Sequence, residues 1–361
     1  MKRKKYMYSI LVIQQKMIGD VLLSSILCEG LKKKYPEAII DYLVYPNTIP
    51  VIKNNPFIDT IIPFEKEYKD SKQSFFKFLK KIRNKNYTMV IDAYGKTESN
   101  LITLFSGANE KISYYKWYTS IFYTSTIKRK PITLTNAGNA LENRLRLIHK
   151  EEDIVANIIR PMIFLTNEER ISAKKYLQYN ELDAKTPLIM ISVLGSSKEK
   201  SLPPLYMAKI IDFIALITQG NIIFNYIPNQ IREAKEIYDL THKTTQKHIH
   251  FNVFGKNLRE FIGILSHCTM LIGNEGGAVN MAKALDINTF TIFSPWIRKD
   301  VWNMFEDGKH HDSTHLIDYN PEIYKEVTYK KLKNKSIELY KELTPERIIP
   351  KLNNYITNLM K

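Results

Sequence analysis

The stretch YSILVIQQKMIGDVLLSSILCEGLKKKYPEAIIDYLVY, residues 8–45, decides the fold class of the chain. Residues 8–14 and 38–45 are short runs rich in apolar, β-branched and aromatic side chains, whereas residues 20–34 repeat apolar side chains at helical spacing. A strand, a helix and a second strand in this order form a βαβ unit, in which the two strands run parallel. The stretch therefore predicts an α/β protein built on a parallel sheet.

The same alternation continues along the chain and then starts again. The first series goes on through FIDTIIPF (57–64), a Lys-rich helix (70–84) and YTMVIDAY (87–94), and a second series follows a polar stretch around 165–186. With 361 residues the chain exceeds the usual size of a single hydrophobic core. We therefore predict two Rossmann-like lobes, residues 1–164 and 165–340, with parallel sheets facing a central cleft. A C-terminal helix within 341–361 is a candidate to cross back to the first lobe.

The composition is that of an ordinary globular protein, with 44% apolar and 25% charged residues. Lys and Arg number 53 against 37 Asp and Glu, which gives a formal net charge of +16. This charge favours an anionic partner: a nucleic acid, a phosphorylated metabolite or an acidic membrane surface. A solvated Lys-rich surface explains it equally well, since the only dense basic run is KRKK at 2–5, a run also suited to anionic lipid.

Cysteine usage and hydropathy indicate the compartment. Cys28 and Cys268 are far apart in the sequence and indicate neither a disulfide framework nor a Cys-based metal site, so we expect a cytoplasmic protein. The apolar run after MKRKK is short and lacks a small-residue cleavage site. No run of about 18 apolar residues occurs, so we expect no membrane-spanning helix.

The first candidate site lies where the first strand leads into a helix, in KMIGD, which contains Lys16, Gly19 and Asp20. In open parallel sheets ligands bind beyond the carboxyl ends of the strands, where the segment DAYGKTESN (92–100), with Lys96, is also expected. A carboxylate at the start of a helix is most often only a cap. From these residues alone, capping is the favoured role of Asp20 and catalysis the alternative.

Two further strand-to-helix junctions lie in the second series. In LGSSKEKSLPP (194–204), Gly195 lets backbone approach a ligand, and Ser196, Ser197 and Lys200 supply hydroxyls and a cation, as a phosphate site requires. An ordinary basic turn fits these residues as well. In LIGNEGGAVNMAKAL (271–285), Gly276 and Gly277 leave room for a ligand beside Glu275, which can accept hydrogen bonds from sugar hydroxyls.

Other motifs are weaker. The histidines give no H-E-x-x-H motif, and KHHD (309–312) is too isolated to indicate a metal site, so we predict a solvated loop there and no metal. The spacing around Gly276 is not the G-x-G-x-x-G of a dinucleotide site.

Taken in order, several segments resemble glycosyltransferase family 9, the bacterial ADP-heptose:lipopolysaccharide heptosyltransferases. The resemblance covers most of the chain and is carried by these segments: IGDVLLSSILCEGLKKKYPEAIIDYLV, NPFIDTIIPF, YTMVIDAYGKTESNLITLFSGANEKISYY, GSSKEKSLPPLYMAKII, NLREFIGILSHCTMLIGNEGGAVNMAKAL and TFTIFSP. It implies a GT-B fold with the acceptor on the first lobe and the nucleotide-sugar on the second. It also implies an inverting transfer that needs neither metal nor cofactor.

The resemblance also implies roles for individual residues. Asp20 matches the catalytic base, Lys200 and Ser196 match the residues on the donor phosphates, and Glu275 matches the acidic residue on the donor sugar. The remaining candidates are Ser197, Gly276, Gly277 and Asn280 for the donor, and Lys16, Gly19 and Lys96 for the acceptor. Asp92, Lys96 and Glu98 are the alternative bases.

The chain departs from the family pattern at four positions. Glu275 and Gly276 stand where the family usually has Asp and then Ser or Thr, Asn280 stands in place of His, and Leu202 in place of Trp. These changes bear on the donor sugar and on activity more than on the fold.

The predicted function is transfer of a heptose or similar sugar, with ADP-heptose as donor and lipid A and core oligosaccharide as acceptor. The protein would work at the inner face of the inner membrane, in contact with its surface. Four alternatives stay open: transfer from another nucleotide-sugar, a nucleotide-sugar epimerase, an inactive nucleotide-binding relative, and a nucleic-acid-binding or scaffolding protein. The family signatures in both lobes disfavour the epimerase, and the absence of a clustered basic motif with stacking residues disfavours the nucleic-acid-binding or scaffolding protein.

Overall fold

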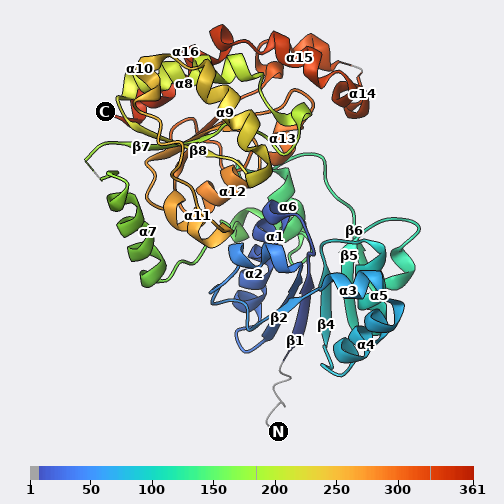
Figure 1. Cartoon of the computed structure of the whole chain (residues 1–361). Helices are drawn as coiled ribbons and strands as arrows, with labels where there is room; N and C mark the ends of the chain where they lie inside the picture. Colours follow the sequence, from blue (N-terminus) through green and yellow to red (C-terminus); the bar gives the residue numbers. More distant parts are fainter. Residues whose placement is uncertain (1–7, 184, 326) are drawn as a thin grey trace. The chain divides into compact units, whose positions relative to one another are not determined.

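The computed structural model describes residues 8–183, 185–325 and 327–361. The chain divides into two compact units, unit 1 (Met1–Phe164) and unit 2 (Leu165–Lys361). Each is an α/β unit with its own parallel sheet (Figure 1). The KRKK run lies outside the described residues.

Within the described residues, the sheet of unit 1 has six strands in the order β3-β2-β1-β4-β5-β6, and all its pairings are parallel. This is a Rossmann-type order, with the change of direction between β1 and β4. The strands of unit 1 are β1 (Ser9–Ile13), β2 (Ile39–Val44), β3 (Thr60–Pro63), β4 (Met89–Asp92), β5 (Glu110–Tyr114) and β6 (Ser125–Ile127). Its helices are α1 (Ile18–Ser24), α2 (Ile26–Lys34), α3 (Lys66–Asp70), α4 (Lys72–Arg83), α5 (Thr97–Phe105) and α6 (Asn139–Leu145).

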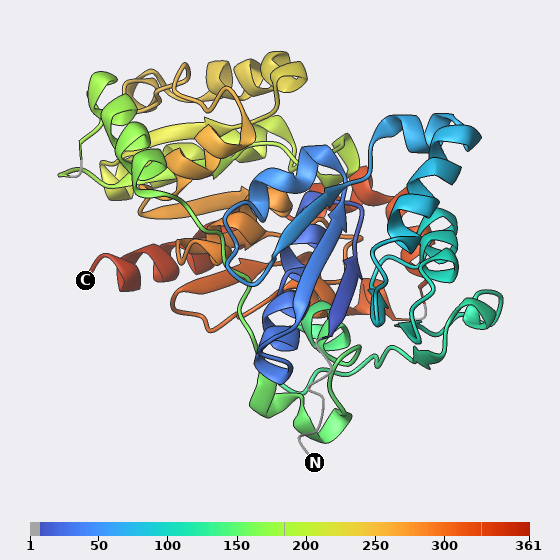
Figure 2. The ribbon, with the colours of Figure 1, turned by 90° about the horizontal axis from the view of Figure 1, so that it is seen from below.

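The strands of unit 1 are apolar because both faces of the sheet are covered. Leu11 and Ile13 of β1 pack with Phe78 and Ile82 of α4 in one core cluster. Figures 1 and 2 show α4 and α5 on this side of the sheet, and α1 and α2 on the other. The single helix expected over 20–34 is two, α1 and α2, divided at Ser25.

Within the described residues, the sheet of unit 2 has five parallel strands in the order β11-β10-β9-β7-β8. The strands of unit 2 are β7 (Leu188–Ser192), β8 (Asn221–Asn225), β9 (Met270–Asn274), β10 (Asn288–Ile292) and β11 (His311–Thr314). Its helices are α7 (Asn167–Tyr179), α8 (Pro204–Thr218), α9 (Ile231–Leu240), α10 (Lys243–Gln246), α11 (Leu258–Leu265), α12 (Gly277–Ala284), α13 (Lys299–Trp302), α14 (Tyr329–Asn334), α15 (Ser336–Glu342) and α16 (Pro345–Leu359).

Alternate residues of the unit 2 strands face opposite sides of the sheet. Ile189 and Ile191 of β7, with Phe290 and Ile292 of β10, join the core cluster to which α8, α9 and α16 contribute. Figure 1 shows these helices on one side of the sheet and α11 and α12 on the other. The C-terminal helix α16 belongs to unit 2, where it packs on α8 and β11.

Two segments differ from the expectations. The polar stretch around 165–186 contains α7, which begins with a capping box in which Thr166 and Glu169 bond each other's backbone N–H. Only the first half of KHHD is a solvated loop: Lys309 and His310 are exposed, whereas His311 and Asp312 start the edge strand β11 and are buried. His311 Nδ1 lies 3.1 Å from Thr289 Oγ1, within hydrogen-bond distance.

One helical stretch among the described residues, Lys198–Thr218, is long and apolar enough to cross a membrane by length and composition alone. The expectation of no such stretch counted uninterrupted apolar residues, and Lys209 and Asp212 interrupt this one. Ile210, Ile211 and Ile214 of α8 pack into the core of unit 2. A core helix passes the same test, so the stretch is weak evidence for a membrane span.

Candidate functional site

Asp20 is the third residue of α1, just beyond the carboxyl end of β1. Its Oδ2 accepts a hydrogen bond from the Met17 backbone N–H at 3.5 Å, a long distance for such a bond. The side chain of Asp20 keeps 27% of its surface exposed. The capping contact is therefore weak, and the carboxylate is open to a ligand.

Arg144, in α6, holds the other oxygen of this carboxylate. Its Nη2 lies 2.6 Å from Asp20 Oδ1. The same guanidinium donates from Nε to Ser24 Oγ and from Nη1 to the Ala140 carbonyl, both at 2.8 Å. Because these two bonds fix the guanidinium, it can orient the carboxylate and compensate its charge. The sequence analysis missed Arg144, which lies far from Asp20 along the chain.

Asp92, one of the alternative bases, ends β4 and is fully buried. Its Oδ1 accepts hydrogen bonds from the backbone N–H groups of Tyr94 (2.9 Å) and Gly95 (2.8 Å). Its Oδ2 accepts one from the Tyr123 hydroxyl at 2.7 Å. Burial raises the pKa of Asp92 above its usual value. These contacts shape the turn after β4, so we assign Asp92 a structural role.

The turns after β1 and β4 lie side by side. The two strands are neighbours in the sheet, and Ile13 pairs with Asp92. Burial, with further contributions from nearby groups including Asp20 and Asp92, raises the pKa of Tyr94 to about 12. The expectation that both strand ends share one edge of the sheet is therefore confirmed, and Lys16, Gly19 and Asp20 lie on the turn after β1.

Three cations, here called the basic group, surround the turn after β4: Lys96, Lys116 and Arg129. Lys96 is exposed at the start of α5. Lys116 Nζ donates to the Gly95 carbonyl at 2.6 Å. Burial and the positive charges of Lys96 and Arg129 lower the pKa of Lys116. These three positive charges favour an anionic ligand at this edge of unit 1.

In unit 2 the predicted phosphate loop follows β7. Ser196 and Ser197 are exposed, and Lys200 lies in a short 3₁₀ turn, Lys198–Lys200. A Cβ on Gly195 would lie 2.2 Å from the Lys200 carbonyl oxygen, which is a reason for glycine at this position that the sequence analysis did not give. The loop therefore needs glycine in order to fold back on itself.

Lys200 and Glu275, predicted at separate junctions, lie together. Lys200 Nζ is 3.1 Å from Glu275 Oε1, and their side chains are 25% and 12% exposed. Glu275 follows β9 and precedes α12, whose first residue is Gly277. A Cβ on Gly276 would meet no atom within 4 Å, so the space beside this turn is open. Asn280 lies one turn further along α12.

Asn274, fully buried at the end of β9, joins the two junctions. Its Nδ2 donates to the carbonyls of Ser192 (3.0 Å) and Val193 (2.9 Å). Its Oδ1 accepts from the Leu202 backbone N–H at 2.8 Å. Leu202, where the family usually has Trp, is itself fully buried. Asn274 thus fixes the loop that carries Lys200 against the strand that carries Glu275.

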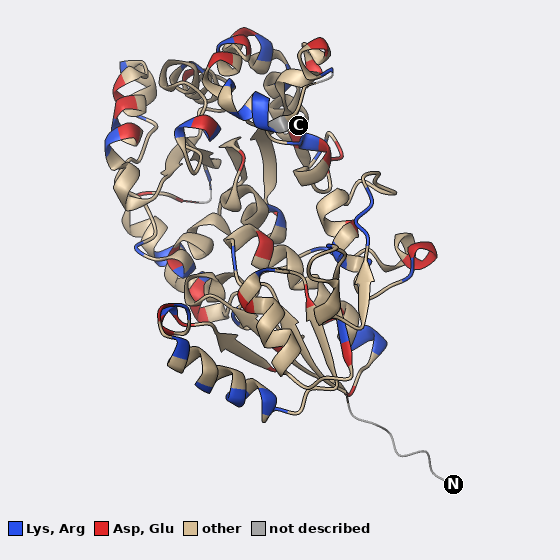
Figure 3. Ribbon diagram, turned by 90° about the vertical axis from the view of Figure 1, so that its right-hand side faces the viewer, with Lys and Arg blue, Asp and Glu red and all other residues tan. Residues whose placement is uncertain are grey.

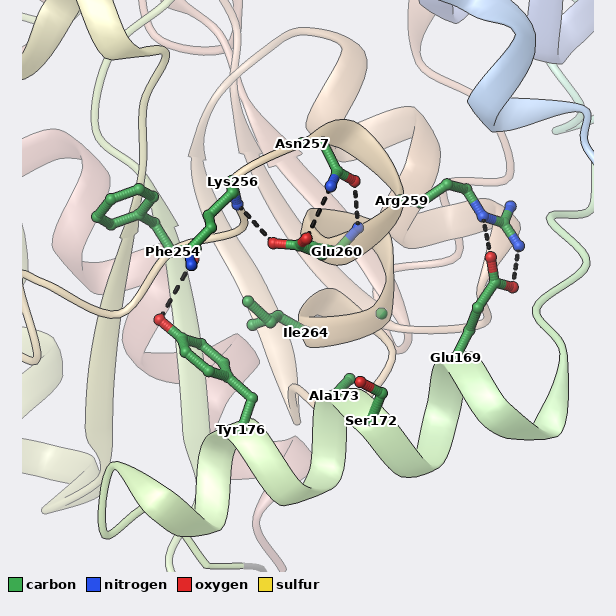
Figure 4. Close-up of a pocket in the computed structure, with 11 residues that line it drawn as sticks. Glu169, Ser172, Ala173, Tyr176, Phe254, Lys256, Asn257, Arg259, Glu260 and Ile264 are labelled. Atoms are coloured by element: carbon green, nitrogen blue, oxygen red, sulfur yellow. Dashed lines mark hydrogen bonds and ion pairs between the residues drawn. The ribbon is translucent and has the colours of Figure 1, made fainter.

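A pocket of about 390 Å³ lies in another part of unit 2, between α7 and α11 (Figure 4). Two of its charged groups, Glu169 and Arg259, pair with each other, and Glu260 accepts hydrogen bonds from the Lys256 backbone N–H and from the Asn257 amide. These three side chains are therefore engaged within the protein. Among the described residues, no group of three or more His, Cys, Asp or Glu is arranged to hold a metal ion.

Two Rossmann-type units with polar residues at the carboxyl ends of their strands are the architecture of GT-B glycosyltransferases. The chain belongs to glycosyltransferase family 9 (heptosyltransferase), whose sequence profile matches residues 75–301. The predicted family and GT-B fold are thereby confirmed.

Relatives and solved structures agree with this family. The chain is 29% identical to lipopolysaccharide heptosyltransferase 3 of Escherichia coli over 134 residues, 36% of this chain and 39% of that protein. It is 24% identical to lipopolysaccharide heptosyltransferase 1 of Campylobacter coli over 298 residues, 79% of this chain and 83% of that protein. The chain thus spans well under half the length of the E. coli relative.

Two solved structures have the same fold. The family 9 glycosyltransferase of Veillonella parvula has a TM-score of 0.79 at 18% identity, covering 98% of this chain and 97% of that one. The E. coli ADP-heptose lps heptosyltransferase II has a TM-score of 0.73 at 16% identity, covering 98% of this chain and 100% of that one.

Proposed function

We propose that the protein is an inverting glycosyltransferase that moves a heptose from ADP-heptose to a lipopolysaccharide-core acceptor. The observation that carries the proposal is the family match, which includes Lys200 and Glu275. ADP-heptose is proposed as donor because it is named for the E. coli enzyme of the same fold. Asp20 lies outside the matched residues, so its role rests on its geometry and on the family resemblance.

On the acceptor side, Asp20 acts as general base. It takes the proton of the acceptor hydroxyl as that oxygen attacks the anomeric carbon of the heptose. Arg144 binds Oδ1 and thereby directs Oδ2, which has only the long contact to Met17, toward the hydroxyl. The bond between the anomeric carbon and the diphosphate breaks on the opposite face, so the configuration inverts and the nucleoside diphosphate leaves.

On the donor side, Lys200 and the exposed hydroxyls of Ser196 and Ser197 bind the diphosphate. Negative charge grows on the diphosphate as it leaves, and Lys200 stabilises that charge most in the transition state. Glu275 accepts hydrogen bonds from the sugar, and Gly276, Gly277 and Asn280 line the approach to it. Because Lys200 supplies the positive charge, we expect no metal or cofactor requirement.

The acceptor is proposed to be anionic. Lipid A and the inner core carry phosphates, and the basic group of Lys96, Lys116 and Arg129 would attract them to the edge of the sheet where Asp20 lies. Lys16 and Gly19 are further acceptor candidates on the same edge. Such an acceptor would keep the enzyme at the inner face of the inner membrane.

The test is a transfer assay with a panel of nucleotide-sugars and a heptose-deficient lipopolysaccharide acceptor. The proposal expects ADP release and a heptosylated product, with the rate unchanged by EDTA. Transfer from a UDP- or GDP-sugar alone would show that this nucleotide-sugar, and not ADP-heptose, is the donor. A strict metal requirement would contradict the mechanism. Nucleotide binding without transfer from any donor would identify an inactive relative.

A further inference from the structure

A small cavity of about 40 Å³ lies beside Glu275 in unit 2, between α12, β10 and α13. Its polar lining consists of Glu275, Asn280, Lys283 and Thr291, and apolar side chains complete the wall. A cavity of this size has room for a group of one to a few water-sized units. It is therefore too small for a nucleotide but large enough for part of a sugar.

Thr291 is the first sign that the cavity takes a polar ligand. Thr289 and Thr291 of β10 point to the side of the sheet opposite to Phe290 and Ile292, which lie in the core cluster. The Thr289 hydroxyl lies within hydrogen-bond distance of His311. The Thr291 hydroxyl is buried, with 1% of the residue exposed, and has no hydrogen-bond partner among the described residues. Buried hydroxyls are rarely left unpaired, so a ligand or water is expected to pair with it.

Lys283 is the second sign that the cavity takes a polar ligand. Its Nζ donates to the Met304 carbonyl and to Asn303 Oδ1 (3.3 Å), and an ammonium has three donors. Burial lowers the pKa of Lys283 to about 8, although the charges of Glu306 and Asp307 oppose this shift, so a further polar partner would favour the ammonium form. A ligand oxygen in the cavity would be such a partner.

The cavity also adjoins the proposed diphosphate site, because Glu275 belongs to both. Lys200 Nζ is 3.1 Å from Glu275 Oε1, and Glu275 lines the cavity. A sugar joined to a phosphate on Lys200 would therefore lie next to Glu275, which is part of the cavity wall.

We propose that this cavity receives the hydroxyl-bearing exocyclic side chain of the donor sugar, and that Thr291 and Lys283 bind its oxygens. The inference rests on the proposed function and names the feature of the donor that the site selects. The side chain of a heptose is longer than that of the matching hexose by one hydroxyl-bearing carbon. The cavity thus favours the heptose donor over a hexose donor with the same ring and nucleotide.

The test compares Thr291→Val with Thr289→Val. The two variants make the same isosteric change on the same face of one strand, but only Thr291 lines the cavity. Calorimetry would give the dissociation constants of ADP, of ADP-heptose and of the matching ADP-hexose. We expect Thr291→Val to bind ADP-heptose about 5- to 10-fold more weakly, the effect of one lost hydrogen bond, with ADP affinity unchanged. Thr289→Val should keep the wild-type preference between the two sugars.

Thermal unfolding supplies a check on folding. Thr291→Val removes an unpaired buried hydroxyl and should melt at or above the wild-type temperature, whereas Thr289→Val, which loses its contact to His311, should melt lower. Val279→Leu, which narrows the cavity from α12, is a second variant and should weaken ADP-heptose binding more than ADP-hexose binding.

An unchanged preference between the two sugars in both Thr291→Val and Val279→Leu would overturn the inference, and the cavity would then hold only water. This failure is distinct from failure of the proposed function. If the wild-type protein transfers heptose while both variants keep the preference, only the cavity assignment is wrong. If the wild-type protein transfers no sugar but binds ADP-heptose in preference to the hexose, with the preference lost in Thr291→Val, only the transfer proposal is wrong.

Discussion

At the scale of single residues, Asp20 combines a weak capping contact, a short ion pair and the proposed base. Asp20→Asn keeps the shape and an acceptor for the Met17 N–H but removes the group that takes the proton. We expect turnover to fall on the order of 10²-fold or more, with ADP affinity retained. The variant should also lose about 1–3 kcal/mol of unfolding free energy, because Arg144 is only 10% exposed and loses its carboxylate partner.

Steady-state kinetics and urea unfolding would measure both effects. Glu98→Gln is the control, since Glu98 lies in the first turn of α5, at the neighbouring strand end, and carries the same change of charge. Near-normal turnover by a folded Asp20→Asn protein would show that Asp20 is not the base.

Arg144 is expected to act by positioning Asp20. Arg144→Lys keeps the charge, but an ammonium cannot hold Asp20, Ser24 and the Ala140 carbonyl in the planar arrangement of a guanidinium. We expect kcat to fall about 10-fold, with ADP affinity unchanged. Arg146→Lys makes the same change at a residue whose Nε bonds Glu151 at 2.7 Å. An equal loss of kcat in both variants would mean that Arg144 acts only through stability.

The sequence predicted which residues lie at the same edge of a parallel sheet, but not which of their side chains form ion pairs. Asp20 and Lys96 were expected at one edge because the carboxyl ends of parallel strands lie together. The sequence could not identify Arg144 as the partner of Asp20, since α6 lies far along the chain and ENRLR contains two similar arginines. The Lys200–Glu275 pair was also missed, because it depends on the fold of the loop between Gly195 and Leu202.

At the scale of elements, Asn274 connects β7, β9 and the phosphate loop. Asn274→Ala would leave the Leu202 N–H and the carbonyls of Ser192 and Val193 without this partner in a buried place. We expect a loss of about 3 kcal/mol of unfolding free energy. Urea unfolding would measure it, and ADP affinity should fall in parallel because the loop that carries Lys200 loses its anchor.

Asn221→Ala is a suitable control for that change, since Asn221 lies at the start of β8 and contacts His250. It should cost less stability and leave ADP affinity unchanged. An ADP affinity equal to that of the wild-type protein in Asn274→Ala would show that Asn274 does not position the loop.

Strongly periodic elements were predicted well, and polar ones were not. The apolar runs of β1, β7 and β9 and the apolar face of α8 identify core elements directly. No helix was predicted at α7 because the stretch around 165–186 is polar in composition, although Thr166 and Glu169 carry a capping-box signature. The edge strand β11 was missed because its residues, HDST, are polar and become buried only through tertiary contacts.

At the scale of the whole molecule, the positive charge is spread over both units. Figure 3 shows Lys and Arg on many helices and loops of both units, in most places near Asp or Glu, although one helix at the lower edge of the view carries Lys and Arg alone. A protein that binds nucleic acid would be expected to gather cations and stacking residues on one face. The distribution instead fits local roles, such as the basic group near Asp20 and Lys200 beside Glu275.

Because unit 2 has its own core, a nucleoside diphosphate that binds its loops should stabilise that unit by mass action. At a concentration 100 times its dissociation constant, ADP adds about 2.7 kcal/mol to the free energy of unfolding. For a unit of this size that corresponds to a rise of roughly 5–10 °C in unfolding temperature. Differential scanning fluorimetry with ADP, UDP and GDP at equal concentration would measure it, and we expect the largest shift with ADP.

Lys200→Met tests whether ADP binds at the phosphate loop, because it removes the proposed phosphate cation and keeps most of the length of the side chain. We expect most of the ADP shift to disappear and the rate of transfer to fall, since the leaving diphosphate loses its positive partner. Lys209→Met is the matched control, because Lys209 lies on α8 and pairs with Glu346 at 3.7 Å. Its ADP shift should match that of the wild-type protein. If Lys200→Met keeps the full shift, the diphosphate binds elsewhere, and the assignments of Ser196 and Glu275 are then also wrong.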